Sequence, residues 1–401
     1  MLVSIALLTS ANTIPRTLVG LLLPAIYRKQ GLGLEWFWLF SLPLLVIPAR
    51  VLWAPWVDRL GSDAFGRRKS WILPCTIIAV LTYLGLGFIP PTLEHLGLLV
   101  ALLLLVNLAL ATQEIAVDAY VVEALHPEER GVGATARILA EETGQLLAIA
   151  GLMLLYQLAG WQVAISSAGL LFLVLTAPVL ARPEVPVNRA STIARASLRD
   201  FLARRENLAI VAVIGAAALA PGLVSAIISP FLVDMGFAIG EIGIVLGLSS
   251  SLGPIIAGLT LVPWLRRGRS LIQAARLQLL LVPLPSLLFL GLALTQQSSA
   301  ALVGAVIFVS SFVSTPALVL VYTARLGWAS NEQAATDFTT QEAVYVLFRS
   351  LLPGAVAGPF AALAGWPGFF MALLAVSLAG FGSFVLSYES IEQRVAARRS
   401  Q

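Results

Sequence analysis

The chain has 401 residues, of which 59% are hydrophobic and only 11% are charged, with a formal net charge of +4. Its mean hydropathy is +0.91. This composition excludes a soluble globular domain, in which about a quarter of the residues are charged. The apolar residues form runs of about twenty, the length that an α-helix needs to cross a bilayer core of about 30 Å. The sequence therefore predicts an all-α polytopic membrane protein.

Twelve apolar runs are expected to form membrane-spanning helices, in two groups of six. The first group, in an N-terminal half of residues 1–181, comprises 2–27, 36–57, 70–89, 96–122, 132–158 and 162–181. The second group, in a C-terminal half of residues 208–401, comprises 208–234, 239–265, 271–294, 300–325, 336–361 and 367–388. Residues 182–207 link the halves, and their stretch "RASTIARASLRDFLARRE" is typical of a basic amphipathic helix on a membrane surface.

Arginine and lysine are unevenly divided between the two sides of the predicted spans. If the N-terminus is cytoplasmic, only Arg28 and Lys29 lie in loops on the opposite side. Basic residues normally accumulate in cytoplasmic loops, so both termini are expected in the cytoplasm and the protein in the inner (plasma) membrane. The charge then indicates contact with anionic lipids rather than with nucleic acid. The basic residues on the expected cytoplasmic side are Arg59, Arg67, Arg68, Lys69, Arg130, Arg182, Arg189, Arg195, Arg199, Arg204, Arg205, Arg266, Arg267, Arg269, Arg394, Arg398 and Arg399.

Two short repeats indicate that the halves are duplicated. The sequence "APWVDR" at residues 54–59 recurs as "VPWLRR" at residues 262–267, and "AGW" at residues 159–161 recurs at residues 364–366. The offsets are 208 and 205 positions, and both repeats occupy matching places in the predicted topology. Duplicated halves are typical of secondary transporters.

Three longer stretches resemble one protein family. The loop after the second predicted span lies within "LWAPWVDRLGSDAFGRRKSW", the fourth span ends in "TQEIAVDAYVVEALHPEERGVG", and the last two spans contain "EQAATDFTTQEA" and "AGWPGFF". Together they resemble the major facilitator superfamily. Within it they resemble the branch of AmpG-like muropeptide permeases, acetyl-CoA transporters and RhtX/FptX-type siderophore importers. The resemblance implies the major facilitator fold and a secondary active transporter that works by alternating access.

The resemblance also implies that the loop after the second span is a cytoplasmic latch. Asp58 would accept hydrogen bonds from arginines near helix ends and so hold the inner gate closed. The alternative is that the charges of this loop only anchor it at the lipid headgroups, which applies most to Arg68 and Lys69. The predicted latch residues are Asp58, Arg59, Gly66, Arg67, Arg68 and Arg130.

Charged residues inside the predicted spans are the candidates for the transport site. A charge at mid-bilayer costs at least about 2.5 kcal/mol unless it faces water or a partner. Arg16 and Arg349 lie near mid-span, on helix faces shared with Asn12 and Tyr345 respectively. These four residues are predicted to bind an anionic group of the substrate.

The carboxylates in the spans are the candidates for proton coupling, since burial favours a neutral carboxylate and a nearby arginine favours the charged form. The proton is predicted to be carried by Glu141, Glu142 or Glu342. Ion pairs or parts of the gate are expected at Arg50, Glu114, Asp118 and Arg137. Two alternatives stay open: Arg137 and Glu141 form a structural pair within one helix, or Glu114 and Asp118 pair with Arg50 or Arg130.

Two other arginines receive a different interpretation. Arg276 and Arg325 lie near the cytoplasmic ends of their predicted spans. A long basic side chain at such a position commonly extends its charge to the headgroup level. We therefore expect both arginines to extend to the membrane surface.

The sequence favours a transporter over other classes of membrane protein. No Walker A sequence is present, so the energy is expected to come from an ion gradient, with protons as the simplest choice. Two histidines and one cysteine without ligand spacing predict no metal and no cofactor, and no catalytic cluster indicates a membrane-embedded transferase. We expect a monomeric, proton-coupled importer of a small anionic or amphiphilic solute such as a muropeptide, and not an enzyme. A siderophore importer and a transporter-like membrane sensor are the alternatives.

Overall fold

The computed structural model describes residues 7, 10–60, 66, 68–124, 130–181, 205–328 and 334–399, and the regular elements in these ranges are helices. The predicted all-α class is therefore confirmed. The chain divides into two compact units. Unit 1 comprises Met1–Ala190 and Ser229–Ser251, and unit 2 comprises Ser191–Ile228 and Leu252–Gln401. The predicted amphipathic linker lies outside the described residues as far as residue 204.

Unit 1 begins with two irregular spans. The first consists of α2 (Thr13–Thr17), the π-helix η1 (Leu18–Leu22) and α3 (Leu23–Lys29). The second consists of the 3-10 helix η2 (Leu34–Leu45), α4 (Val46–Ala49), the 3-10 turn η3 (Arg50–Leu52) and α5 (Ala54–Arg59). Pro43, Pro48 and Pro55 interrupt the second span, and each proline lacks the N–H group that a continuous helix would use.

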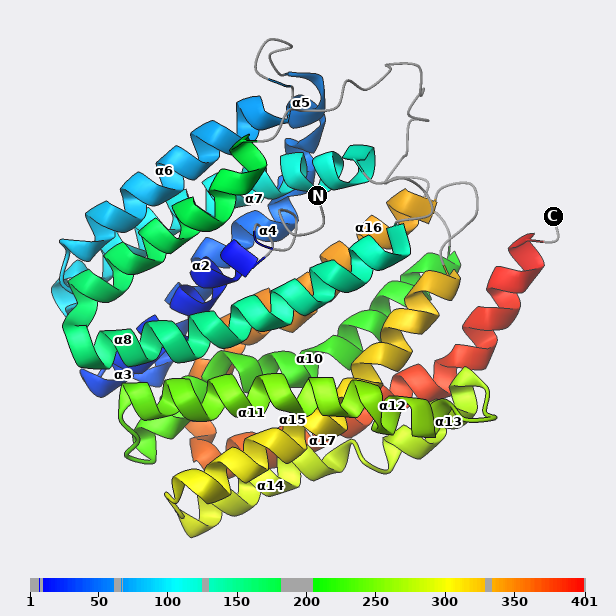
Figure 1. Ribbon diagram of the computed structural model, residues 1–401. Helices are drawn as coiled ribbons and strands as arrows, with labels where there is room; N and C mark the ends of the chain where they lie inside the picture. Colours follow the sequence, from blue (N-terminus) through cyan, green and yellow to red (C-terminus); the bar gives the residue numbers. More distant parts are fainter. Residues whose placement is uncertain are drawn as a thin grey trace. The chain divides into compact units, whose positions relative to one another are not determined.

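Longer helices complete unit 1 and build unit 2 (Figure 1). In unit 1, α6 (Lys69–Gly87) is followed by the 3-10 turn η4 (Leu93–His95), α7 (Leu96–Ala124) and α8 (Arg130–Ala181). The helices α10 (Arg205–Asp234) and α11 (Ile239–Leu259) contribute residues to both units. Unit 2 continues with α12 (Leu261–Arg266), α13 (Leu271–Leu279), α14 (Pro283–Thr295), α15 (Ala300–Trp328), α16 (Ala334–Val346), the π-helix η5 (Leu347–Leu351) and α17 (Leu352–Arg399).

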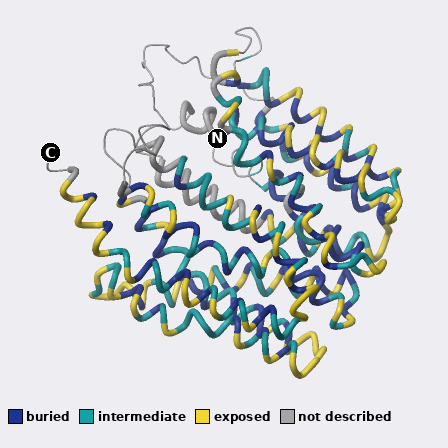
Figure 2. Tube along the Cα trace, turned by 180° about the vertical axis from the view of Figure 1, so that it is seen from behind, coloured by how far each residue is buried: buried dark blue, intermediate teal, exposed yellow. Residues whose placement is uncertain are grey.

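Helices lie along the described parts of the ranges that were expected to span the membrane. Eight stretches of the described chain are long and apolar enough to cross a bilayer, and Leu34–Ala49 is a shorter apolar stretch. Two of the eight, Gly144–Val179 and Thr340–Ala397, each contain a break at a glycine. The outward stretches of the helices are coloured as exposed in Figure 2. Large apolar side chains such as Leu363 and Leu386, which are 87% and 84% exposed, are expected where a helix meets lipid rather than water.

The repeated "AGW" sequence marks the same sharp turn in both units. Gly160 within α8 has φ 81° and ψ −179°, and Gly365 within α17 has φ 65° and ψ 170°. This region of backbone space is open essentially to glycine alone. Trp161 follows the first turn, is buried, and donates its indole N–H to the carbonyl of Leu86 at 2.8 Å. Each turn therefore has a glycine for a backbone reason, independent of side-chain packing.

The repeat of "APWVDR" and "VPWLRR" marks a second shared feature, a short helix after a break. In unit 1, α5 follows Trp53, whose φ is −113°. In unit 2, α12 follows Thr260, whose φ is −121°. The tryptophans of the two helices, Trp56 and Trp264, are 64% and 55% exposed. The duplicated sequence thus corresponds to a duplicated local structure.

Candidate transport site

The most buried charge among the described residues is Arg325 on α15, whose side chain is 2% exposed. Its guanidinium forms an ion pair with Glu342 on α16. The same group lies over the rings of Tyr345 and Tyr322, at 5.0 and 5.8 Å from their centroids. The prediction that Arg325 extends to the headgroups is wrong, because a carboxylate and two aromatic faces stabilise its charge inside unit 2.

Glu342 differs from Arg325 in its exposure, with a side chain that is 40% exposed. The ion pair therefore joins a desolvated guanidinium to a carboxylate that remains accessible. A proton that binds Glu342 would remove the charge that balances Arg325.

Arg349 has a different environment, although it follows Glu342 by only seven positions. It lies in the π-helix η5 and donates from Nη1 to the hydroxyl of Ser225 on α10 at 2.9 Å. Within the described chain, no carboxylate lies at ion-pair distance from this guanidinium. A side chain at Gly222 of α10 would overlap the carbonyl oxygen of Arg349, so this glycine permits the close approach of the two helices. Such π-helical turns often occur at functional sites.

In unit 1, Arg50 and Glu114 form an ion pair, one of the arrangements that the sequence left open. Nη1 of Arg50 lies 2.5 Å from Oε2 of Glu114, and the side chains are 29% and 13% exposed. Nearby, the indole of Trp53 donates to the hydroxyl of Thr112 at 3.1 Å. Both contacts attach the broken second span to α7, and they give the pair a bracing role.

The first span carries Asn12 and Arg16. Asn12 is 8% exposed, and its Oδ1 has no hydrogen-bond partner within the described chain. Arg16 belongs to α2, directly before the π-helix η1, but its side chain lies outside the described residues. The predicted cargo arginines thus share a local feature, since Arg16 precedes a π-helix and Arg349 lies in one.

Part of the predicted latch is described. Gly66 has φ 93°, a left-handed conformation that favours glycine, and its carbonyl accepts the N–H of Ser70 at 3.0 Å. The side chain of Arg68 is 4% exposed. Trp71 donates its indole N–H to the carbonyl of Leu60 at 2.6 Å and so joins the two ends of the loop.

Several predicted site residues cannot be placed. Arg67 lies outside the described residues, and for the others the backbone is helical but the side chain is not described. No contact is assigned to these side chains. These residues are Asp58, Arg59, Asp118, Arg130, Arg137, Glu141 and Glu142.

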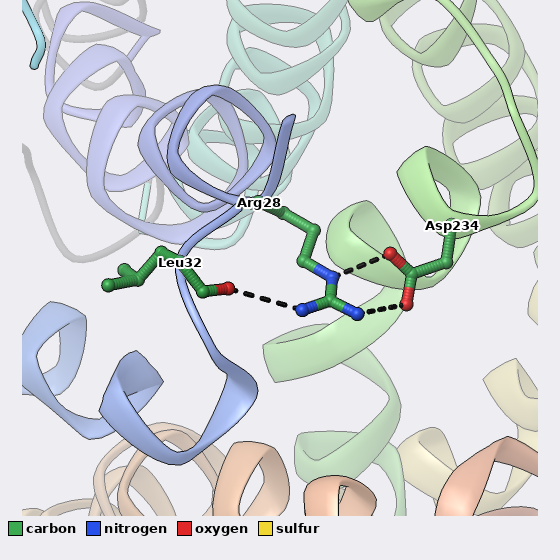
Figure 3. Close-up of polar contacts among 3 residues, drawn as sticks. All are labelled: Arg28, Leu32 and Asp234. Carbon is green, nitrogen blue, oxygen red and sulfur yellow. Dashed lines mark hydrogen bonds and ion pairs between the residues drawn. The ribbon is translucent and has the colours of Figure 1, made fainter. Parts of the chain in front are cut away.

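The sequence did not predict an ion pair at the ends of α3 and α10 (Figure 3). Nε and Nη2 of Arg28 donate to the two carboxylate oxygens of Asp234 at 2.5 and 2.7 Å, while Nη1 donates to the carbonyl of Leu32 at 3.1 Å. Both side chains are 23% exposed. The two residues are 206 positions apart, close to the offsets of the repeats, so they occupy equivalent places in the duplicated halves. Opposite charges at equivalent positions of the two halves were the feature of the sequence that could have indicated this pair.

A second contact near this pair has a similar spacing in the sequence. The hydroxyl of Ser229 on α10 donates to the carbonyl of Leu21 in η1 at 2.8 Å, across 208 positions. On α8, Gln157 accepts the backbone N–H of Gly240 on α11. Both contacts lie within unit 1, so spans expected in different sequence halves are joined there by polar contacts as well as by Arg28 and Asp234.

The chain is similar to known transporters along most of its length. The profile described as Major Facilitator Superfamily matches residues 5–351. The anhydromuropeptide permease of Escherichia coli strain K12 is 28% identical over 396 residues, which cover 95% of this chain and 78% of the permease. A putative transporter, AmpG 4, of Rickettsia conorii is 24% identical, with 96% of each chain covered. The resemblance found in the sequence is confirmed.

Solved structures of low sequence identity share the fold. A bacterial homologue of the human lysosomal transporter Spinster, in an inward-facing and occupied conformation, has a TM-score of 0.67 and 16% identity, with 99% of this chain and 94% of that chain covered. The nucleoside transporter NupG has a TM-score of 0.71 and 13% identity, with 97% and 98% covered. The sequence relatives are permeases and transporters, which makes this protein a transporter and not an enzyme. The duplicated local structures and the profile match across residues 5–351 lead to one conclusion: this multi-pass membrane protein belongs to the major facilitator superfamily.

Proposed function

We propose that the protein imports a small anionic or amphiphilic solute, with a muropeptide as the leading candidate, by proton-coupled alternating access. The observation that carries this proposal is the contrast between two arginines of unit 2. Arg325 is paired with Glu342, whereas Arg349 has a hydroxyl partner and no carboxylate at ion-pair distance within the described chain. A guanidinium in this situation can bind the carboxylate or phosphate of a cargo through two parallel hydrogen bonds.

The cargo class is supported by similarity and by chemistry together. The relative that is 28% identical is an anhydromuropeptide permease, and a muropeptide carries carboxylates that suit Arg349. In unit 1, Asn12 offers a buried amide oxygen that has no hydrogen-bond partner among the described residues, and Arg16 is proposed as the cationic contact of that unit. Tyr345, next to Arg325, is proposed to contact the cargo beside Arg349.

Proton coupling is assigned first to Glu342. Its carboxylate is accessible and balances a buried guanidinium, so protonation has a direct electrostatic consequence inside the protein. Glu141 and Glu142 remain alternative proton carriers. Arg50, Glu114, Asp118 and Arg137 are proposed to brace or gate the helices around the pathway.

Two gates are proposed at opposite ends of the spans. The inner gate is the latch of Asp58, Arg59, Gly66, Arg67, Arg68 and Arg130, and the outer gate includes Arg28 and Asp234. Both termini are proposed to face the cytoplasm and the protein to act as a monomer in the inner membrane, without a cofactor. Release of one gate while the other is closed would give alternating access.

A vesicle experiment tests the function. Right-side-out and inside-out vesicles that contain the protein are supplied with labelled anhydromuropeptides or ferric siderophores, with and without an uncoupler. We expect muropeptide accumulation in right-side-out vesicles, its loss with the uncoupler, and continued exchange of preloaded cargo. Accumulation of the siderophore alone would support the alternative importer, and saturable binding of cargo without flux would support a sensor. Accumulation that follows sodium instead would contradict proton coupling.

Variants of Arg349 test the site. We expect Arg349→Lys to weaken apparent cargo affinity about tenfold, because lysine is a point charge without the planar fork, and Arg349→Ala to weaken it further. Thermal-shift titration of purified protein with the anhydromuropeptide measures the affinity. The matched control is Arg394→Ala, an arginine exposed near the end of α17, which should leave the titration unchanged. Equal cargo stabilisation in wild type and Arg349→Ala would mean that the arginine has a structural role only.

A further inference from the structure

Four arginines gather around the connection between α12 and α13, at the place equivalent to the latch of the first half. They are Arg266, Arg267, Arg269 and Arg276. Arg276 forms an exposed ion pair with Glu389 of α17 at 2.7 Å. Within the described chain, no carboxylate lies at ion-pair distance from the other three. The connection therefore keeps an excess of positive charge.

The surface around these arginines is hollowed. One shallow hollow of about 530 Å³ is lined by Thr260, Pro263, Trp264, Arg266 and Arg267. Another, of about 450 Å³, is lined by Arg269, Gln273, Arg276 and Leu277. Both are wide enough for a phosphate group and its substituents. Their linings combine guanidinium donors with apolar side chains.

Exposed apolar side chains flank the positive charge. Trp264 is 55% exposed, and Leu259 and Leu280 are 75% and 73% exposed. The guanidinium of Arg269 lies 5.4 Å from the ring centroid of Trp264 and donates to the carbonyl of the same residue at 2.9 Å. An indole beside basic residues at the end of an apolar helix is typical of the membrane interface.

We propose that α12 and the start of α13 form a binding site for an anionic phospholipid. Arg266, Arg267 and Arg269 would bind the headgroup phosphate through charge-assisted hydrogen bonds, and Trp264 would lie at the level of the glycerol backbone. The acyl chains would cover Leu259 and Leu280. A soluble phosphate would gain the polar contacts but not the apolar ones, so the lipid is the better ligand.

This inference goes beyond the transport function and is independent of the cargo. The equivalent short helix of the first half, α5, carries the acid Asp58 where α12 carries the base Arg266, 208 positions later. The replacement of the acid by an arginine suits anion binding. The connection between α12 and α13 therefore differs in charge from the equivalent loop of the first half.

Lipid retention by the purified full-length protein tests the site. Native mass spectrometry in detergent compares binding of phosphatidylglycerol with phosphatidylcholine of identical chains. We expect preferential retention of phosphatidylglycerol by the wild type. Retention should be roughly tenfold weaker in the double variant Arg267→Gln with Arg269→Gln, since each basic contact contributes a similar share of the binding free energy. The control Arg394→Gln removes an exposed arginine elsewhere and should leave retention unchanged.

Two further measurements keep the test decisive. The variant Arg267→Lys with Arg269→Lys retains the charge and should keep more than half of the preference, which separates charge loss from misfolding. Glycerol phosphate in millimolar excess should not displace the lipid. Unchanged preference in the double glutamine variant, an equal loss in Arg394→Gln, or displacement by glycerol phosphate would each overturn the proposal of a lipid site.

Discussion

Two ion pairs, one in each unit, join neighbouring helices and differ in which partner is buried. In the pair of Arg50 and Glu114 the carboxylate is the less exposed partner, at 13% against 29%. In the pair of Arg325 and Glu342 the guanidinium is buried, at 2%, and the carboxylate is 40% exposed. The carboxylate of Glu342 is thus more exposed than that of Glu114. We infer that the first pair is a brace and the second a switch.

The surroundings of the two pairs agree with this difference. Beside Arg50, the indole of Trp53 is tied to Thr112 by a second polar contact, so the broken span is attached to α7 at two points. Beside Glu342, the aromatic faces of Tyr345 and Tyr322 solvate the guanidinium of Arg325. Aromatic faces can hold a cation whether or not the carboxylate is charged. The second pair is therefore better suited to a change of charge.

Replacement of the two glutamates should separate brace from switch, with the largest effect expected in transport. Glu342→Gln removes the negative charge but keeps an amide oxygen that can accept from Arg325. We expect at least a tenfold loss of proton-driven accumulation, with exchange of preloaded cargo retained. Glu114→Gln should leave accumulation within about twofold of wild type, because the bracing hydrogen bond can persist. Equal loss in both variants, or a loss in Glu114→Gln alone, would contradict the comparison.

Much of the fold could be predicted from the sequence, because the spans are set by apolar run length and the turns by local chemistry. The repeats at Gly160 and Gly365 correctly marked equivalent turns, and those at α5 and α12 marked equivalent short helices. The interruptions at η1 and η5 were not predicted. A π-helix arises from packing against other helices, and no residue type in "LVGLL" or "LFRSL" requires one.

The site was less predictable, because its contacts join residues far apart in the sequence. Glu342 and Arg349 stood out as charges inside a span. The environment of Arg325 was predicted wrongly, because its position near a helix end indicated the membrane surface and not an ion pair with Glu342 on the following helix. The pair of Arg28 and Asp234 was missed because 206 positions separate its members. Only the offset between the duplicated halves could have indicated that pair.

The same offset shows that the halves carry opposite charges at equivalent places. Asp118 and Arg137 precede Arg325 and Glu342 by 207 and 205 positions in the sequence. An acid in one half thus corresponds to a base in the other, in the order acid then base in the first half and base then acid in the second.

Substitutions at the two glycine turns test a feature in which the two units should respond alike. Gly160→Ala and Gly365→Ala should each lower the free energy of unfolding by about 1–3 kcal/mol, because alanine is strained at these backbone angles. Thermal denaturation in detergent measures the change. Gly151 in α8 and Gly382 in α17 provide matched controls, since a methyl group added there meets no atom within 4 Å. Alanine at the controls should leave stability unchanged or slightly higher. A loss at only one turn would show that the duplicated turns are not equivalent.

The smallest effect is expected at the ends of α3 and α10, where the pair of Arg28 and Asp234 joins equivalent positions of opposite charge. Both side chains are only 23% exposed and meet through two hydrogen bonds, so Arg28→Gln or Asp234→Asn should cost about 1 kcal/mol of stability. The charge swap, with Arg28→Asp and Asp234→Arg together, should recover part of that loss, because equivalent positions can exchange their charges. The recovery should be incomplete, because the hydrogen bond from Arg28 to the carbonyl of Leu32 cannot be restored. Thermal denaturation at low and high salt measures the stability of the single variants and of the charge swap. High salt should reduce the difference in stability between the wild type and the single variants. If the double variant is as unstable as the sum of the single variants, the two residues are not coupled and the proposed outer gate lies elsewhere.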